Sequence, residues 1–364
     1  MRAFPFGAKG LPAKSGRAEA RKSGADGEGS DFPLFLTSSL RRARRGSRFT
    51  GWHSKLPSAN MKMLECVPNF SEGRNRKTID AVADALQRVG GVRLLDICTD
   101  ADHNRTVFTF LGAPDDIERG AAAACDRALE LIDMRAQRGV HPRIGAVDVV
   151  PFIPLKNAVM QDAVETARRF GRAFAQRNRL PVFFYGEAAL VEERRELPHI
   201  RRGGYEALDK RMKDPAWAPD AGPSVLNARS GATAVGARDF LVAFNINLAS
   251  ADLDAARKIA GTIRHSGGGM KHVKAIGVPL KSRGIVQVSM NLTNFRETSV
   301  KDVFERVQAE AARLGLGILE SELVGLIPEE ALEGVTPQQL MLKDFREDRI
   351  VERHLPPAGA GREA

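Results

Sequence analysis

The chain has 364 residues, and 43% of them are hydrophobic, which is enough for one large core or two of ordinary size. Its formal net charge of +10 first suggests a nucleic-acid partner. The charge is unevenly spread, however: residues 1–62 carry 13 Lys and Arg against four acids, and the rest of the chain carries 42 against 41. The larger part is nearly neutral, so we expect no nucleic-acid partner for it.

Cysteine content and hydropathy indicate the cellular compartment. The three cysteines, Cys66, Cys98 and Cys125, form no C-x-x-C pair, which argues against a disulfide framework and for a reducing environment. The longest apolar runs have six or seven residues, too few to cross a membrane. We therefore expect a cytoplasmic location and no membrane partner.

Residues 1–60 are rich in Arg, Ser and Gly and lack helical or strand periodicity, so we expect them to be disordered. Three interpretations of this basic extension are open. It resembles an organelle transit peptide in composition, its cluster Arg41-Arg42-Ala43-Arg44-Arg45 would suit a tail that binds nucleic acid or membrane, or translation starts at Met61 or Met63. The last is favoured because nothing downstream depends on this segment.

From Met63 the chain alternates short β-like runs with helical patterns. Apolar residues recur at helical spacing from Ile79 to Val89, with Thr78 as the expected cap, and Pro114 with two acids behind it suits the first turn of a second helix. The expected elements are a strand at 64–67, a helix at 78–89, strands at 92–97 and 106–111, a helix at 114–134 and a strand at 146–153. This order is the split βαβ pattern of ferredoxin-like folds.

A helix at 159–178 and a strand at 182–185 extend this half, and a long irregular stretch at 197–237 follows. The second half then repeats the order of strands and helices predicted for the first. Its expected elements are a strand at 241–248, a helix at 252–264, strands at 275–280 and 285–291, a helix at 300–314 and a strand at 323–327. The sequence thus predicts an α/β (α+β) fold of two subdomains, 61–238 and 239–350, and a cleft between subdomains is a usual ligand site.

The chain contains no phosphate-binding or dinucleotide-binding glycine motif and no G-x-S-x-G elbow. Cys98, Asp100, Asp102 and His103 lie within one loop, but metal sites normally draw ligands from two elements, and no second His/Cys pair exists. We therefore expect neither a metal nor a nucleotide cofactor.

Two clusters of polar residues lie next to predicted strands, at positions that the hydrophobic core does not require. Asp102-His103-Asn104-Arg105 precedes a strand, and His141-Pro142-Arg143 lies just ahead of another. Loops at strand ends often carry catalytic groups, and an imidazole exchanges protons near neutral pH. A surface or capping role is the alternative for a lone loop histidine. The residues alone therefore indicate a cleft enzyme with a histidine candidate.

A series of segments, in order and without large gaps over about residues 63–327, carries a resemblance to a known family. The segments are Glu65-Cys66-Val67-Pro68-Asn69-Phe70-Ser71-Glu72-Gly73, Asn104-Arg105-Thr106-Val107, His141-Pro142-Arg143-Ile144-Gly145-Ala146-Val147-Asp148, Tyr185-Gly186-Glu187-Ala188-Ala189, Trp217-Ala218-Pro219-Asp220, Gly231-Ala232-Thr233, Gly236-Ala237-Arg238, Phe244-Asn245-Ile246-Asn247-Leu248, Gln287-Val288-Ser289 and Leu323-Val324-Gly325-Leu326. Together they resemble the formiminotransferase domain of the formiminotransferase-cyclodeaminase family. The resemblance does not extend to residues 1–60 or to the cyclodeaminase part of that family.

The resemblance implies two ferredoxin-like βαββαβ subdomains with a folate tunnel between them, usually in a homodimer. It implies transfer of a formimino group from N-formimino-L-glutamate to N5 of tetrahydrofolate, a step of histidine degradation and one-carbon metabolism, with a separate cyclodeaminase as a possible partner. It places the general acid/base on His141. It places folate contacts on Gly222, Pro223, Ser224, Val225, Leu226, Asn227, Ala228, Arg229, Ser230 and Gly231.

The carboxylate partner of the proposed base is open, because some members of the family have an aspartate where this chain has Cys98, and Asp100 or Asp102 could replace it. Both substrates carry carboxylates, so cations must hold them. Asn104, Arg105 and Arg143 are candidate supporting or substrate residues, and Arg229 lies in the folate loop; surface salt bridges are the alternative for each arginine. Two other functions are open: a formyltransferase that uses N-formylglutamate or 5-formyltetrahydrofolate, and a folate-binding module without catalysis.

Overall fold

The computed structural model describes residues 41–42, 60–101, 103–139, 142–280 and 283–355. The disorder expected for residues 1–60 therefore stays a prediction, since it falls almost entirely outside these ranges. Within that segment, only β1 (Arg41–Arg42) and the residue before Met61 are described, and β1 pairs antiparallel with β4 (Val92–Asp100).

The first half builds a sheet around four antiparallel strands in the order β4-β5-β2-β6. Here β2 is Leu64–Cys66, β5 is Arg105–Gly112 and β6 is Val147–Pro154. The short β3 (Asn69–Phe70) pairs with both β5 and β6. Beyond β6 the sheet continues in parallel through β8 (Thr233–Ala237) and β7 (Val182–Gly186).

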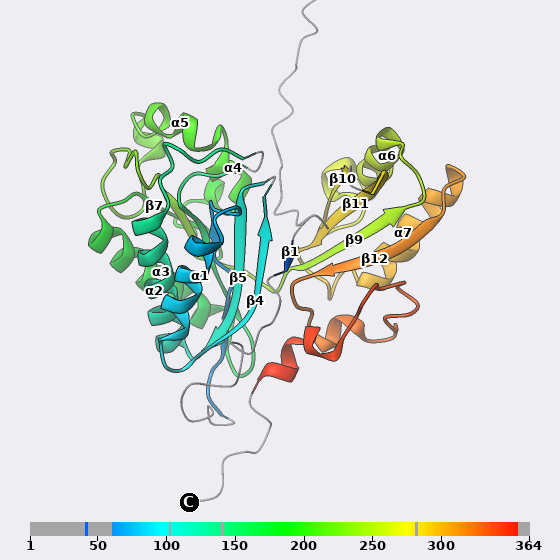
Figure 1. The fold of residues 1–364 in the computed structure, drawn as a ribbon, viewed down its shortest axis with the longest axis horizontal. Coiled ribbons are helices and arrows are strands. Elements are labelled where there is room, and N and C mark those ends of the chain that lie inside the picture. The colour runs from blue at the N-terminus through cyan, green and yellow to red at the C-terminus, as the bar shows by residue number, and fades with distance from the viewer. Residues whose placement is uncertain (1–40, 43–59, 102, 140–141, 281–282, 356–364) are drawn as a thin grey trace, which may run out of the picture. The chain divides into compact units, whose positions relative to one another are not determined.

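Three helices cover one face of this sheet (Figure 1): α1 (Arg76–Gln87), α2 (Pro114–Leu131) and α3 (Met160–Asn178). Their apolar faces share one core with the strands. Pro114 stands in the first turn of α2, as predicted. The cap predicted for α1 was wrong: Asn75 accepts hydrogen bonds from the backbone N–H groups of Lys77 and Thr78, and Thr78 lies inside the helix.

The stretch expected to be irregular is more ordered than its composition suggested. It contains α4 (Leu197–Arg201), α5 (Gly204–Arg211), a 3-10 turn at Pro215–Trp217 and strand β8. Another 3-10 turn, Glu192–Arg194, lies just before it. In the β8 sequence, Thr-Ala-Val-Gly-Ala, the strand-favouring Thr and Val alternate with Ala and Gly, which are depleted in strands. Its order comes from parallel pairing on both sides, with β6 and β7, which no local pattern announces.

The second half forms a separate four-stranded antiparallel sheet in the order β10-β11-β9-β12. Its strands are β9 (Val242–Leu248), β10 (Val273–Leu280), β11 (Ile285–Leu292) and β12 (Ile318–Val324). The last strand was predicted too late in the sequence, at 323–327. In each half the four core strands follow one order: second, third, first, fourth along the chain.

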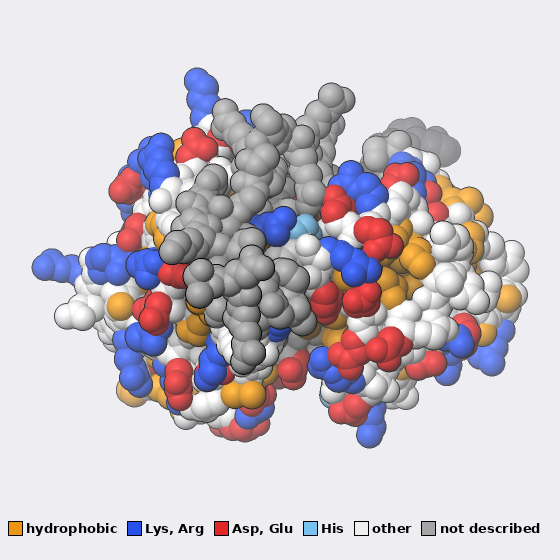
Figure 2. All heavy atoms as spheres, turned by 90° about the horizontal axis from the view of Figure 1, so that it is seen from below, with side chains coloured by type: hydrophobic (Ala, Val, Ile, Leu, Met, Phe, Trp, Pro, Cys, Tyr) orange, Lys and Arg blue, Asp and Glu red, His pale blue; other side chains and the backbone are white. Residues whose placement is uncertain are grey.

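Two helices, α6 (Leu253–Ile263) and α7 (Val300–Arg313), pack on one face of the second sheet. Asp252 and Ser299 cap their N-termini through side-chain hydrogen bonds. Short 3-10 turns occur at His265–Gly267, Glu329–Leu332, Glu347–Arg349 and Val351–His354. On the face drawn in Figure 2, Lys/Arg and Asp/Glu side chains are interspersed among the described residues.

The packing of α6 on β10 depends on Gly277, and this dependence can be tested. A Cβ at Gly277 would lie 2.4 Å from the Arg257 backbone nitrogen, so Gly277→Ala must push the helix off the strand. We expect a loss of about 1–3 kcal/mol in the free energy of unfolding, measured by urea denaturation. Gly261→Ala is the matched control: it lies within α6 with no atom nearby, so it should stabilise the protein by about 0.5–1 kcal/mol. Equal effects of the two changes would contradict the close approach.

Candidate active site

The turn between β4 and β5 carries the first predicted polar cluster. Asn104 is buried in a left-handed backbone conformation (φ 50°). Its Oδ1 accepts a hydrogen bond from the Gly73 nitrogen at 2.9 Å, and its Nδ2 donates to the Arg138 carbonyl at 3.1 Å and to the Gln137 side chain. Asn104 therefore ties three loops together. Asp102 lies outside the described residues.

The second predicted cluster is described on both sides of His141, which itself lies outside the described residues. Before it, a Cβ on Gly139 would lie 2.3 Å from the His103 carbonyl oxygen, so this segment runs against the β4–β5 turn. After it, the Ile144 nitrogen donates to Asp148 Oδ1 at 2.9 Å. The structure thus brings together the two loops that the sequence singled out.

A buried ion pair lies beneath these loops. Asp148, at the start of β6, pairs through Oδ2 with Arg201 of α4, and both side chains are almost fully buried. Arg105 is buried beside them. Burial and, to a smaller extent, the neighbouring charge of Arg201 lower the pKa of Arg105 to about 10, while Asp148 and Asp100 oppose this shift. Arg105 therefore keeps its charge at neutral pH inside a structural cluster.

Arg143 is buried, and its guanidinium donates to the Gln137 carbonyl at 3.1 Å and to Glu206 of α5 at 2.9 Å. The Glu206 side chain is mostly exposed, so this pair can exchange with solvent or with another anion. Arg143 Nε is also buried without a hydrogen bond among the described residues. Arg143 therefore retains donor capacity near the loop.

His103 forms a pair that the sequence did not reveal. Its Nδ1 lies 2.6 Å from Asp100 Oδ2, and its backbone nitrogen donates to Asp100 Oδ1 at 2.9 Å. The Asp100 side chain is fully buried. One of the two acids proposed as partners of His141 therefore already bonds to a different histidine.

The predicted folate loop, residues 222–231, is anchored at its C-terminal end. The Ala146 nitrogen donates to the Ser230 carbonyl, and Asn227 Oδ1 accepts from the nitrogens of Arg229 and Ser230. Gly231 has a φ of 74°, and a Cβ there would lie 2.2 Å from the Ile144 carbonyl oxygen. The loop therefore lies directly against the residues that follow His141.

Within this loop the side chains differ in exposure and in use. Val225 is 71% exposed, so its side chain is accessible from solvent. Arg229 instead donates to the Glu130 carbonyl at 2.7 Å, at the end of α2, and lies 3.7 Å from Asp133. For Arg229 the structural alternative therefore fits better than a carboxylate-binding role.

A small cavity of about 60 Å³ lies between strands of the two sheets. Glu65, Asn69 and Asp96 line it from the first sheet, with Cys98, whose Sγ lies 3.1 Å from Asp96 Oδ2. Glu65 is only 3% exposed. Burial raises the pKa of Glu65 from 4.5 to about 7, Arg238 partly offsets this, and Glu352 adds to it. A carboxyl group that titrates near neutrality inside a cavity is typical of functional sites.

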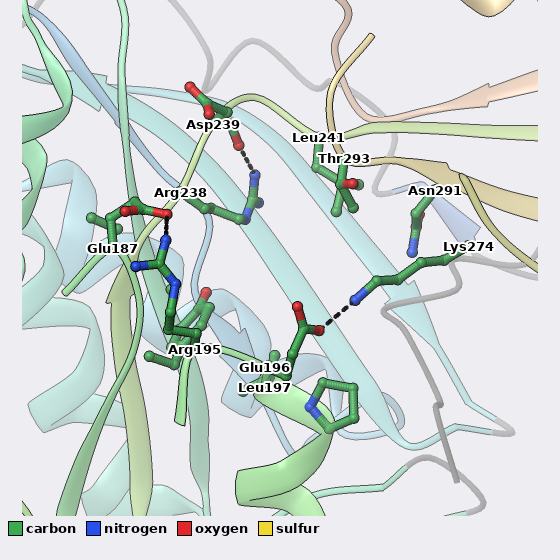
Figure 3. Close-up of a pocket in the computed structure, with 14 residues that line it drawn as sticks. Glu187, Arg195, Glu196, Leu197, Arg238, Asp239, Leu241, Lys274, Asn291 and Thr293 are labelled. Carbon is green, nitrogen blue, oxygen red and sulfur yellow. Dashed lines mark hydrogen bonds and ion pairs between the residues drawn. The ribbon is translucent and has the colours of Figure 1, made fainter. Parts of the chain in front are cut away.

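A larger pocket of about 260 Å³ shares the lining residues Arg238 and Leu241 with this cavity. Figure 3 shows the residues that line the larger pocket. Sequence reasoning assigned no role to Glu65 or Arg238. Both residues lie in segments that carry the family resemblance; the local signals were an acid within the apolar run 64–67 and a cation directly after β8. Both signals become meaningful because the two sheets share these cavities.

The pKa of Glu65 makes a prediction for the pH dependence of stability. The folded state holds the Glu65 proton more tightly than the unfolded chain, so the free energy of unfolding must fall as the pH rises from about 4.5 to about 7. This loss should reach about 3 kcal/mol. Urea denaturation at pH 5 and pH 8 should show that Glu65→Gln removes it, whereas Glu333→Gln, at an exposed position, should not. A wild-type profile that Glu65→Gln leaves unchanged would contradict the burial of this carboxyl group.

Removing one partner of the Asp148–Arg201 pair should be costly, because it leaves a lone buried charge. Asp148→Asn leaves Arg201 and Arg105 buried without their shared countercharge, so we expect a loss of about 3–5 kcal/mol in the free energy of unfolding. Asp209→Asn removes the exposed pair with Lys213 and should cost less than about 1 kcal/mol. Denaturation of the two variants gives the comparison, and similar losses would show that the buried cluster is no more important than a surface pair.

Two properties of the described residues bear on alternative functions. None of their helices combines the length and hydropathy needed to span a membrane. They also contain no group of three or more His, Cys, Asp or Glu side chains arranged to hold a metal ion.

Comparison with known proteins identifies the family. A family model described as the formiminotransferase domain, N-terminal subdomain, matches residues 63–238, and one described as the formiminotransferase domain matches residues 243–344. A glutamate formimidoyltransferase of Thermoplasma acidophilum is 44% identical, over 82% of this chain and 99% of that protein. A glutamate formimidoyltransferase of Streptococcus pyogenes serotype M1 is 43% identical, over 81% of this chain and 99% of that protein.

A longer relative matches over the same region. The formimidoyltransferase-cyclodeaminase of Rattus norvegicus is 45% identical over 74% of this chain and 51% of its own length. The two family models and the near-complete coverage of the shorter relatives leave one conclusion. This chain belongs to the formiminotransferase family.

Proposed function

We propose that the protein is a glutamate formimidoyltransferase, which transfers the formimino group of N-formimino-L-glutamate to N5 of tetrahydrofolate. The observation that carries this function is the 44% identity to the Thermoplasma acidophilum glutamate formimidoyltransferase over 99% of that protein's length. Tetrahydrofolate is then a co-substrate, and the reaction belongs to histidine degradation and one-carbon metabolism.

The chemistry needs one group that moves a proton twice. N5 of tetrahydrofolate attacks the amidine carbon and loses its proton, which gives a tetrahedral intermediate. The bond from that carbon to the glutamate nitrogen then breaks, and this nitrogen must receive a proton to leave as an amine. We assign both transfers to His141, because an imidazole near its ordinary pKa can accept and return a proton at neutral pH.

The surroundings of the loop support this assignment. On one side of His141, Gly139 lies against the β4–β5 turn, and on the other, Ile144 is bonded to the buried Asp148. A loop held at both ends by rigid strands can present a side chain with the precision that proton transfer requires. Arg143, with its exchangeable partner Glu206, is the supporting cation next to the base.

The proposal extends to the fold and the folate site. The shared strand order of the two sheets supports two ferredoxin-like βαββαβ subdomains. The two cavities that share Arg238 and Leu241 support a substrate tunnel between these subdomains. The loop of residues 222–231, through exposed groups such as Val225, is the folate-binding segment, and a homodimer is the expected assembly.

The assignment of His141 can be tested with a matched pair of histidine variants. His141→Asn keeps a polar side chain but cannot take a proton, so kcat should fall by about 100- to 10,000-fold. The Kd of tetrahydrofolate should stay within a few-fold of the wild-type value. His103→Asn is the control, since the His103 imidazole is already engaged by Asp100, and its kcat should fall much less.

The assay follows transfer to tetrahydrofolate across the pH range. In the wild type, the acidic limb of the pH–rate profile reports protonation of the base, and this limb should flatten in His141→Asn. A near-normal kcat in His141→Asn, or an unchanged acidic limb, would falsify the role of His141 as the base. Transfer from N-formylglutamate but not from N-formimino-L-glutamate would overturn the proposed donor.

A further inference from the structure

The larger pocket has the size and the polar groups of a site for a small acidic ligand. Its volume is about 260 Å³. Residues from β7, α4 and the end of β8 line it on one side, and residues of β10 and β11 line it on the other. Figure 3 shows Arg238, Lys274 and Asn291 extending from different segments toward the same space.

Two of the three cations in this pocket are already neutralised. Arg195 pairs with Glu187, and Lys274 lies 2.9 Å from Glu196. Arg238 differs from both. Its guanidinium donates to the Asp239 backbone carbonyl at 2.9 Å rather than to a carboxylate, and Figure 3 draws this contact. Arg238 Nε is buried without a hydrogen bond among the described residues.

A buried hydroxyl lies beside this cation. Tyr185 is 4% exposed and lines the pocket. The Arg238 guanidinium lies close enough to hydrogen-bond to this hydroxyl, but no described residue accepts the hydroxyl's own proton. A buried hydroxyl whose proton has no acceptor costs free energy, so a ligand that accepts this proton beside Arg238 would be stabilised there.

We propose that this pocket binds a glutamyl group, with Arg238 holding a carboxylate and the Tyr185 hydroxyl donating a hydrogen bond to it. This inference rests on the proposed function, in which both substrates contain a glutamyl group. A guanidinium suits a carboxylate because it donates parallel hydrogen bonds to both oxygens. The exposed Lys274–Glu196 pair at the opposite wall can release its ammonium to a second carboxylate.

The arginines predicted from the sequence fit this role less well. Arg105 is buried and interacts electrostatically with Asp148, and Arg229 donates a hydrogen bond to the end of α2. Arg143 is paired with Glu206. Arg238 differs from these three. It lines a pocket of adequate volume, and its guanidinium donates to a backbone carbonyl and pairs with no described carboxylate.

The first test measures glutamate binding without turnover. Arg238→Gln should weaken binding of L-glutamate, measured by titration calorimetry on the full chain, by about 10- to 100-fold, the usual value of a charge-assisted contact. Arg349→Gln is the matched control, since Arg349 has similar burial, also donates to a backbone carbonyl, that of Gly325, and lies outside the pocket. Its affinity should stay within about threefold of the wild-type value.

The second variant separates ligand binding from structure. Tyr185→Phe keeps the ring and loses at most the contact between the hydroxyl and Arg238, so its melting temperature should change little. Its affinity for L-glutamate should nevertheless fall several-fold. If Arg238→Gln and Tyr185→Phe both bind L-glutamate as tightly as the wild type, the proposal is overturned.

Two substrate arms identify the source of the glutamyl group. A raised KM for N-formimino-L-glutamate alone in Arg238→Gln assigns the pocket to the donor. A raised KM for tetrahydrofolate, with an unchanged KM for tetrahydropteroate, which lacks glutamate, assigns it to the folate tail. Because L-glutamate binding needs no catalysis, a wild-type protein that binds it without transferring a formimino group overturns the proposed function and leaves the pocket assignment standing.

Discussion

The buried pair between Asp148 and Arg201 is the interaction on which the candidate active site depends. One carboxylate oxygen binds the guanidinium from α4, and the other accepts the N–H of Ile144, three residues after His141. A single side chain at the start of β6 thus fixes a helix and a loop. Because burying two charges costs nearly what their attraction returns, the pair contributes position more than stability, and its loss is costly because a lone buried charge remains.

Much of the fold could be predicted because it rests on local periodicity. Helices α3 and α6 and strand β9 have clear helical or strand patterns, and their predicted limits lie within one or two residues of the observed ones. Strand β8 could not be found in this way, because its small residues gain strand structure only between β6 and β7. Strand β12 was shifted, since Glu320 and Glu322 mask its alternation and face Asn247 across the sheet.

The sequence predicted which loops meet at the site but not how the charged side chains there are paired. The two loops that the sequence selected do meet, because Gly139 packs on the carbonyl of His103. The roles of the arginines could not be read from the sequence, since a role depends on partners brought in from other elements. Arg105 meets Asp148 and Arg201, and Arg229 meets the end of α2, only in the folded chain. The Asp100–His103 pair was within reach of sequence reasoning, because the two residues are three apart.

Arg238 links the two cavities electrostatically as well as sterically. It follows β8, where the chain passes from the first sheet to the second, and its charge favours the ionised form of Glu65 in the smaller cavity. A carboxylate that binds Arg238 from the larger pocket shares that charge, so the Glu65 carboxyl group then holds its proton more tightly. Binding of an acidic ligand and protonation of Glu65 therefore favour each other. Arg238, which lies between the two sheets in the sequence, thus couples the charges of the two cavities.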